Sequence, residues 1–232
     1  MSIVNGIRTI DNLVAGNLSG AQLETWLGTG INKAGFIQAI NSRSQVRLLT
    51  ESLTALTAIS TSPAAISSIG RSSVSASIRD AIFANASTYS AMIASSTVMA
   101  AVAESALFME KITESNTILA SMFSLVVPKT AFYDSSIGSA ALFASTNAKA
   151  YMVSIATPNT TSSTTHASVN TGKTFLIQQK TTNASFTSHA GANADTYSTA
   201  STTYVNRFVK LVGLTHRISG SNSGTVTYID MD

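Results

Sequence analysis

A ten-residue repeat runs through the middle of this 232-residue chain and limits how it can fold. An apolar residue returns every ten positions, and a small polar residue follows it three places later, except where Leu125 stands in that place. One step, from Ile69 to Ile82, is thirteen residues long. Self-similarity of this length predicts a repeat architecture. The apolar positions are Leu49, Ile59, Ile69, Ile82, Met92, Val102, Ile112, Met122, Phe132 and Leu142.

A ten-residue period does not match a straight α-helix. Ten residues turn a helix through roughly 1000°, which is about 80° short of three full turns. The repeated apolar position would therefore wander around the helix instead of forming a stripe. Two solutions satisfy the spacing: each repeat is a short helix followed by a tight turn, or the whole region is one overwound helix.

The copy "TSPAAISSIGRSS" favours short helices. Ser62 stands where an N-cap belongs, and Pro63 follows at the first helical position, where its missing N–H costs nothing. Gly70 comes just after the last apolar residue, as expected of a glycine that ends a helix, and Ser72 is expected to cap the next helix. A continuous Ala-rich helix with serines on its solvent face is the alternative.

Short helices are marginal by themselves in water, so their apolar faces need cover from neighbouring repeats or from other chains. Alanine and serine fill most of the remaining positions and permit close packing around a symmetry axis. We therefore expect a homo-oligomer, with a homotrimer as the leading arrangement.

The chain before the repeats, residues 1–48, predicts a helical attachment segment. In "NLSGAQLETWLG", Ser19 and Gln22 have the spacing of a capping box. Leu23, Trp26 and Leu27 then share one helix face. We expect these three residues to dock the chain onto a larger assembly, although Trp26 is also a candidate core residue.

After the repeat region, residues 49–147, the pattern changes to the alternation typical of strands. Residues 148–232 predict a C-terminal β domain, and residues 219–224 ("SGSNSG") predict a turn that makes a hairpin of the last two strands. The predicted fold class is α+β in two segregated parts: N-terminal short-helix repeats, then a small antiparallel β-sandwich or jelly-roll-like domain. The expected strands are 149–156, 173–179, 205–212, 214–219 and 225–231.

The sequence predicts no catalytic residues, no cofactor and no metal site. The chain has no cysteine, and its three histidines are far apart without ligand spacing. Its 14 basic residues are scattered, which argues against a nucleic-acid partner. His189, Tyr197 and Tyr204 lie in polar parts of the β region and are candidate receptor-facing residues, or cover for a sheet edge.

One uncharged stretch, residues 81–103, is long enough to span a membrane. It contains Asn85 and several hydroxyl residues, and it belongs to a repeat whose other copies are charged. Membrane insertion is therefore not expected, because insertion favours leucine, isoleucine and phenylalanine over this mixture.

The repeat "SAMIASSTVMAAVAES" resembles the ten-residue Ser/Ala/Met repeats of bacteriophage virion structural and tail-fibre-like proteins. The closing segment "FVKLVGLTHRISGSNSGTVTYIDMD" is similar to the C-terminal ends of phage fibre proteins. The first likeness covers about the central hundred residues, and the second covers the last twenty-five.

This resemblance implies a non-enzymatic structural protein located in the virion: a tail fibre, head fibre or collar appendage. Its N-terminal part would attach to capsid, collar or tail proteins, and its β tip would contact a host glycan or protein, or join another fibre. The alternatives are a bacterial surface adhesin or stalk protein and, less favoured, a membrane-active holin-like protein.

Overall fold

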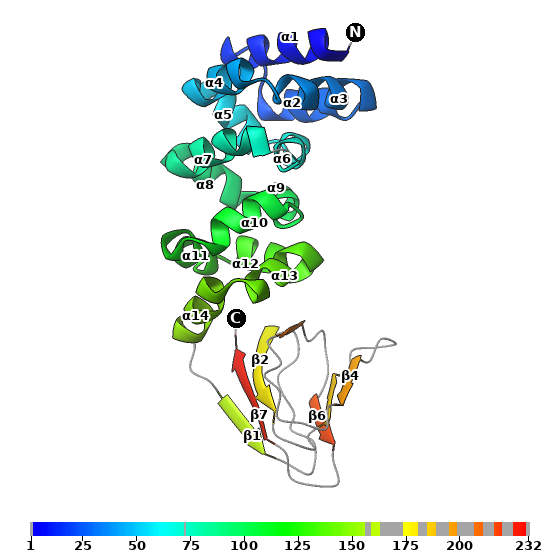
Figure 1. Cartoon of the computed structure of the whole chain (residues 1–232), viewed down its shortest axis with the longest axis vertical. Coiled ribbons are helices and arrows are strands. Elements are labelled where there is room, and N and C mark those ends of the chain that lie inside the picture. Colours follow the sequence, from blue (N-terminus) through cyan, green and yellow to red (C-terminus); the bar gives the residue numbers. More distant parts are fainter. Residues whose placement is uncertain are drawn as a thin grey trace. The chain divides into compact units, whose positions relative to one another are not determined.

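The computed structural model describes residues 2–71 and 73–155 and, beyond them, seven strand segments (Figure 1). The chain divides into two compact units, residues 1–144 and 145–232, and each is described by itself.

Short α-helices make up nearly all of the first unit. They are α1 (Ser2–Val14), α2 (Gly20–Leu27), α3 (Gly30–Ala39), α4 (Arg43–Glu51), α5 (Leu53–Ser60), α6 (Pro63–Ile69), α7 (Ala76–Ala84), α8 (Ala86–Ala94), α9 (Ser96–Ala103), α10 (Ala106–Thr113), α11 (Asn116–Phe123), α12 (Val126–Asp134) and α13 (Ser136–Ala144). A 3₁₀ turn, η1 (Ser73–Ser75), precedes α7. The prediction of broken short helices is confirmed, and the overwound helix is excluded.

The recurring small polar residue is an N-cap, as predicted. At Ser62, Ser95 and Ser115 the side-chain oxygen accepts the backbone N–H three residues later, and the cap backbone is extended. The bond satisfies an N–H that the first helical turn leaves without a partner. Ser52, Asn85, Ser105, Ser135 and Ser145 accept the same kind of bond, and the Ser19–Gln22 capping box forms in full.

Each short helix buries an ordinary amphipathic face. In α9 the buried residues are Val98, Met99, Val102 and Ala103, which lie three, four, seven and eight positions after the cap at Ser95. This is the i, i+3, i+4, i+7 pattern of one helix face. The extended cap then resets the direction: α8 and α9 meet at Ser95 with a bend of 97°. Each ten-residue period therefore consists of one short helix, which buries a single face, and the extended cap at which the chain bends.

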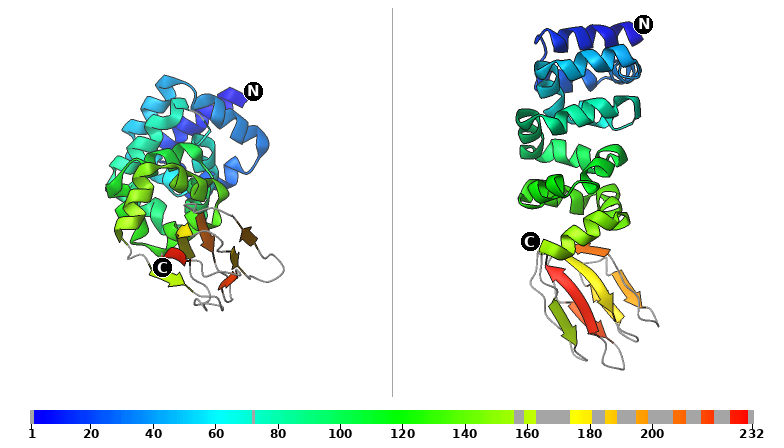
Figure 2. Two further views of the ribbon diagram at one scale, coloured as in Figure 1. Left: turned by 60° about the horizontal axis from the view of Figure 1, so that its bottom comes forward. Right: turned by 60° about the vertical axis from the view of Figure 1, so that its left-hand side comes forward.

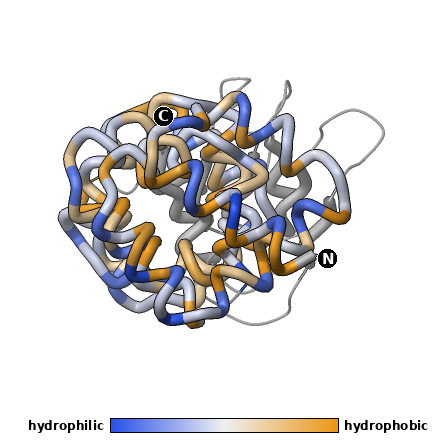
Figure 3. Tube along the Cα trace, turned by 90° about the horizontal axis from the view of Figure 1, so that it is seen from above, coloured by the Kyte–Doolittle hydropathy of each residue, from blue (hydrophilic) through white to orange (hydrophobic). Residues whose placement is uncertain are grey.

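The corners wind the first unit into a coil of three helices per turn. Many of the helices pack on the helix three positions further along the chain, so about thirty residues complete one turn. The trace of these helices runs around a ring when viewed from above (Figure 3), and the layers are visible from the side (Figure 2). The stacked pairs are α2 with α5, α3 with α6, α4 with α7, α5 with α8, α6 with α9, α9 with α12 and α10 with α13.

Stacking within one chain covers the whole series of repeated apolar residues. Leu49, Ile59, Ile69, Ile82, Met92, Val102, Ile112, Met122, Phe132 and Leu142 all have 0% of their surface exposed in the single chain. The reason given above for expecting an oligomer therefore does not hold, because these faces need no cover from sister subunits. The homotrimer stays a prediction that must rest on other grounds.

The thirteen-residue step is absorbed by the 3₁₀ turn η1. The cap in register with Ile82 is Ser75, which makes no side-chain capping bond; its hydroxyl donates instead to the Ile69 carbonyl at 2.8 Å. The predicted cap, Ser72, lies outside the described residues. Gly70 does end α6, but its φ of −62° is right-handed, so the left-handed ending usual for such a glycine is absent. A Cβ atom there would collide with the Ser105 side chain of the next coil.

The second unit begins with α14 (Thr146–Ile155), which corrects the first predicted strand. Residues 149–156 were expected to be a strand because Tyr151 and Val153 favour β structure. The repeat continues instead: Ser145 caps the helix, accepting the Ala148 N–H at 3.1 Å, and Met152 is buried ten residues after Leu142. The cap and the apolar spacing outweigh the β propensity of individual residues.

The described strands form two separate antiparallel sheets. One has the order β1-β7-β2-β5 and the other β4-β3-β6. The predicted final hairpin is wrong, because β6 pairs with β3 whereas β7 pairs with β1 and β2. A long Ser/Gly connection imposes no tight-turn geometry, so it does not force its two strands together. The strands are β1 (Asn159–Ser162), β2 (Thr174–Lys180), β3 (Ser185–Ser188), β4 (Asp195–Ser198), β5 (Arg207–Lys210), β6 (His216–Ser219) and β7 (Thr225–Asp230).

The predicted fold class, α+β with a C-terminal β-sandwich or jelly-roll, is wrong. Most of the described residues are helical, and a sandwich is not seen among them. Segments such as β1 (NTTS) and β4 (DTYS) are short and polar.

Candidate functional site

The predicted docking residues lie on α2, and the structure separates them. Leu23 and Leu27 are fully buried in the chain's own core, with 0% and 1% of their surface exposed. Trp26 is half-buried, and its carbonyl accepts a hydrogen bond from the Asn32 side-chain amide at 3.0 Å. Of the three side chains, Trp26 alone offers surface to a partner.

Glu24, on the same helix, has a role that the sequence analysis missed. Its Oε2 accepts the Ser62 hydroxyl at 2.6 Å and the Ala64 backbone N–H at 2.8 Å. A carboxylate at the start of α6 satisfies a free N–H and suits the positive end of the helix dipole. Glu24 thereby ties the first coil to the second, across about forty residues of sequence.

The predicted receptor-facing residues lie in the strand region. Tyr197 lies in β4, opposite Phe186 of β3 in the antiparallel register. His189 and Tyr204 lie outside the described residues, so Tyr197 is the one of the three whose place the structure describes.

Two capping serines also connect successive coils. The Ser135 hydroxyl accepts the Gly138 N–H at 2.9 Å and donates to the Ala103 carbonyl at 2.9 Å. Ser105 has the same arrangement, with a longer 3.5 Å contact to the Gly70 carbonyl. One hydroxyl therefore satisfies a donor of its own helix and an acceptor of the coil before it. The repeat spacing predicts the capping bond to the N–H of the same helix, whereas the bond to the carbonyl of the earlier coil depends on how the coils stack.

One charged side chain is buried in the stack. Arg79 of α7 is 8% exposed, and its Nη1 donates to the Leu107 carbonyl at 2.7 Å. Its guanidinium also pairs with Asp80 at 2.9 Å, and Lys111 lies 3.5 Å from the same Asp80 oxygen. Arg79 stands four residues after Ser75, at the position that Met99, Met109 and Leu119 fill in the three repeats capped by Ser95, Ser105 and Ser115.

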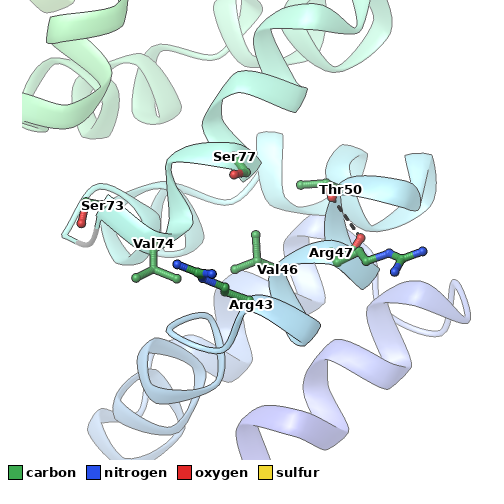
Figure 4. Close-up of a pocket in the computed structure, with 7 residues that line it drawn as sticks. All are labelled: Arg43, Val46, Arg47, Thr50, Ser73, Val74 and Ser77. Carbon is green, nitrogen blue, oxygen red and sulfur yellow. Dashed lines mark hydrogen bonds between the residues drawn. The ribbon is translucent and has the colours of Figure 1, made fainter.

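A surface pocket of about 550 Å³ opens where the repeat spacing breaks (Figure 4). It lies between α4 and the segment that contains η1 and the start of α7. The charged residues in its described lining are both basic, Arg43 and Arg47. From α4 come Arg43, Val46, Arg47 and Thr50, and from the other side come Ser73, Val74 and Ser77.

A second pocket, of about 320 Å³, lies between α9 and α12, next to Leu125. Leu125 takes the cap position but makes no side-chain capping bond. Val126 beside it is 74% exposed, and the Glu104 and Asp134 carboxylates are in the lining. The two departures from the repeat thus coincide with pockets.

Among the described residues, no group of three or more histidine, cysteine or acidic side chains is arranged to hold a metal ion. In the same part of the chain, none of the helices is by itself both long and apolar enough to cross a membrane. The pair α8 and α9, bent at Ser95, meets the length and composition requirement only when its two helices are taken together.

No protein-family model matches the chain, and a search of curated proteins found no match.

Proposed function

We propose that this protein is a non-enzymatic structural subunit of a bacteriophage virion, a fibre or appendage of the tail, head or collar. In this proposal the coil of short helices is a spacer. The N-terminal helices attach to other virion proteins, and the C-terminal strand region is exposed for host contact or for joining another fibre.

The observation that carries the proposal is the self-covered coil. Ten repeated apolar residues are sealed within one chain, and hydrogen bonds from Ser62, Ser105, Ser135 and Arg79 join successive coils. Such a stack is stabilised by contacts between neighbouring coils, as in other solenoids, and does not need a separate globular core. A stack of this kind suits a spacer that keeps two other parts of an assembly apart. The resemblance of the repeat to those of phage proteins points to a virion appendage.

Labelling of intact particles tests the proposal. Antibodies raised against residues 173–232 should decorate virions of the phage that carries this sequence, at one fixed position on each particle. Mass spectrometry of the same purified particles should detect the protein. Particles that contain no trace of the chain would overturn the proposal. Detection in the particle without labelling would instead move the C-terminal region to an interior position.

A further inference from the structure

The pocket between α4 and η1 lies where the repeat has three extra residues. Beside this pocket α4 packs against both η1 and α7. Between Ile69 and Ile82 the added turn Ser73–Ser75 stands before α7, and two of its residues line the pocket. The opening therefore lies at the break in the repeat spacing.

The pocket has an unpaired cation at its edge. Arg43 is exposed and has no hydrogen bond or ion pair to any described residue. Figure 4 shows its guanidinium lying beside Val74, across the opening from Ser77. Arg47, by contrast, pairs with Glu51 at 2.7 Å, and its guanidinium points away from the opening.

The rest of the lining completes a site for an anion with an apolar part. Ser73 and Ser77 offer hydroxyl groups, and Val46 and Val74 provide an apolar wall. Val46 is buried, whereas Val74 is 40% exposed. A guanidinium favours planar carboxylate and tetrahedral phosphate groups, which accept two parallel N–H bonds.

We propose that this pocket binds a carboxylate- or phosphate-bearing ligand, anchored by Arg43, with an adjoining hydrocarbon part on Val46 and Val74. Because one arginine at an open site supplies the charge, binding is weak and falls as salt is added. This site is separate from the proposed role as a virion spacer, and each can fail without the other.

Titration of the full-length protein with sodium butyrate and with inorganic phosphate tests the site, followed by NMR at constant low ionic strength. We expect saturable shifts at the Arg43 Nε–H and, with butyrate, at the Val46 and Val74 methyl groups. R43Q should weaken binding by about tenfold or more, since it removes a charge-assisted hydrogen bond. R8Q, which removes an exposed arginine of α1, is the matched control and should bind as the natural protein does. The ligand that binds more tightly identifies the preferred anionic group.

A second variant tests the origin of the pocket. Deleting residues 73–75 restores ten-residue spacing and places Ser72 three positions before Ile78, where a cap belongs. This variant should stay helical and lose butyrate and phosphate binding although Arg43 is still present. Two results would overturn the proposal: shifts that never saturate in the natural protein, or equal binding by R43Q. If the deletion variant does not fold, the comparison of R43Q with R8Q decides alone.

Discussion

The regular repeats and the two places where the repeat departs from its rule differ in what they leave exposed. In α8 to α11 each helix has a capping side chain and a sealed apolar face. At the thirteen-residue step and at Leu125 the caps lose their side-chain bonds, apolar residues are exposed, and pockets open. Regularity therefore builds the coil, and its interruptions create the surface features to which partners or ligands can bind.

The largest difference is expected between two valines. Val102→Ala removes a fully buried side chain from a regular repeat and should lower the free energy of unfolding by about 2–3 kcal/mol. Val126→Ala, beside the departure at Leu125, removes a side chain that is 74% exposed and should change it by no more than about 0.5 kcal/mol. Urea unfolding followed by circular dichroism measures both. Equal effects would show that the two regions do not differ in packing.

A smaller difference is expected between two kinds of cap. Ser135→Ala loses the capping bond and also leaves the Ala103 carbonyl without its donor, so it should cost about 2 kcal/mol. Ser115→Ala loses a capping bond alone and should cost about 1 kcal/mol. Should the two variants unfold at the same urea concentration, the bond between coils would contribute nothing.

Restoring the repeat at Leu125 should be stabilising. Leu125→Ser returns the side-chain cap that α12 lacks, and it gives up a side chain that is already 40% exposed. The expected gain is about 0.5–1 kcal/mol, observed as a higher melting temperature. A lower melting temperature would mean that Leu125 contributes packing that outweighs the missing cap.

The smallest effect concerns Tyr89 of α8, which lies in a regular repeat. Burial raises the pKa of its hydroxyl above the ordinary value, and the neighbouring Ser121 hydroxyl offsets part of that rise. An acid whose pKa is raised by folding stabilises the native state below its unfolded pKa, and that stability is lost as the pH rises through the higher folded value. Stability should therefore fall above about pH 10. Tyr89→Phe should reduce this fall, and an unchanged pH profile would contradict the assignment.

The caps and the broken helices could be predicted from the sequence because both are local. Ser62 and Pro63 mark the start of a helix within four residues, and the ten-residue spacing of the apolar residues excludes a straight amphipathic helix. Ser19 and Gln22 are equally local, and their capping box forms as predicted.

The coil itself could not be predicted, because it depends on the angle at every corner. A cap such as Ser95 signals a helix start, but its backbone angles of −102° and 119° set the bend, and those angles are not encoded in residue type. Gly70, Glu24 and Arg79 make their contacts between coils, so the sequence alone gives no signal for these roles. The argument for an oligomer failed for the same reason, because the spacing does not show that one chain can bury its own repeated apolar residues.

The central claim is that one chain seals its own repeats by stacking every third helix. A disulfide test addresses it directly, because the natural chain has no cysteine. A Cβ atom at Gly70 would lie 2.8 Å from the Cβ of Ser105, about 1 Å closer than in an ordinary disulfide, so the two coils must move apart by about 1 Å for the bond to form. The doubly substituted variant G70C/S105C, oxidised and run on a non-reducing gel, should be a single chain with an internal cross-link. Chains joined to one another, or no cross-link at all, would contradict the claim.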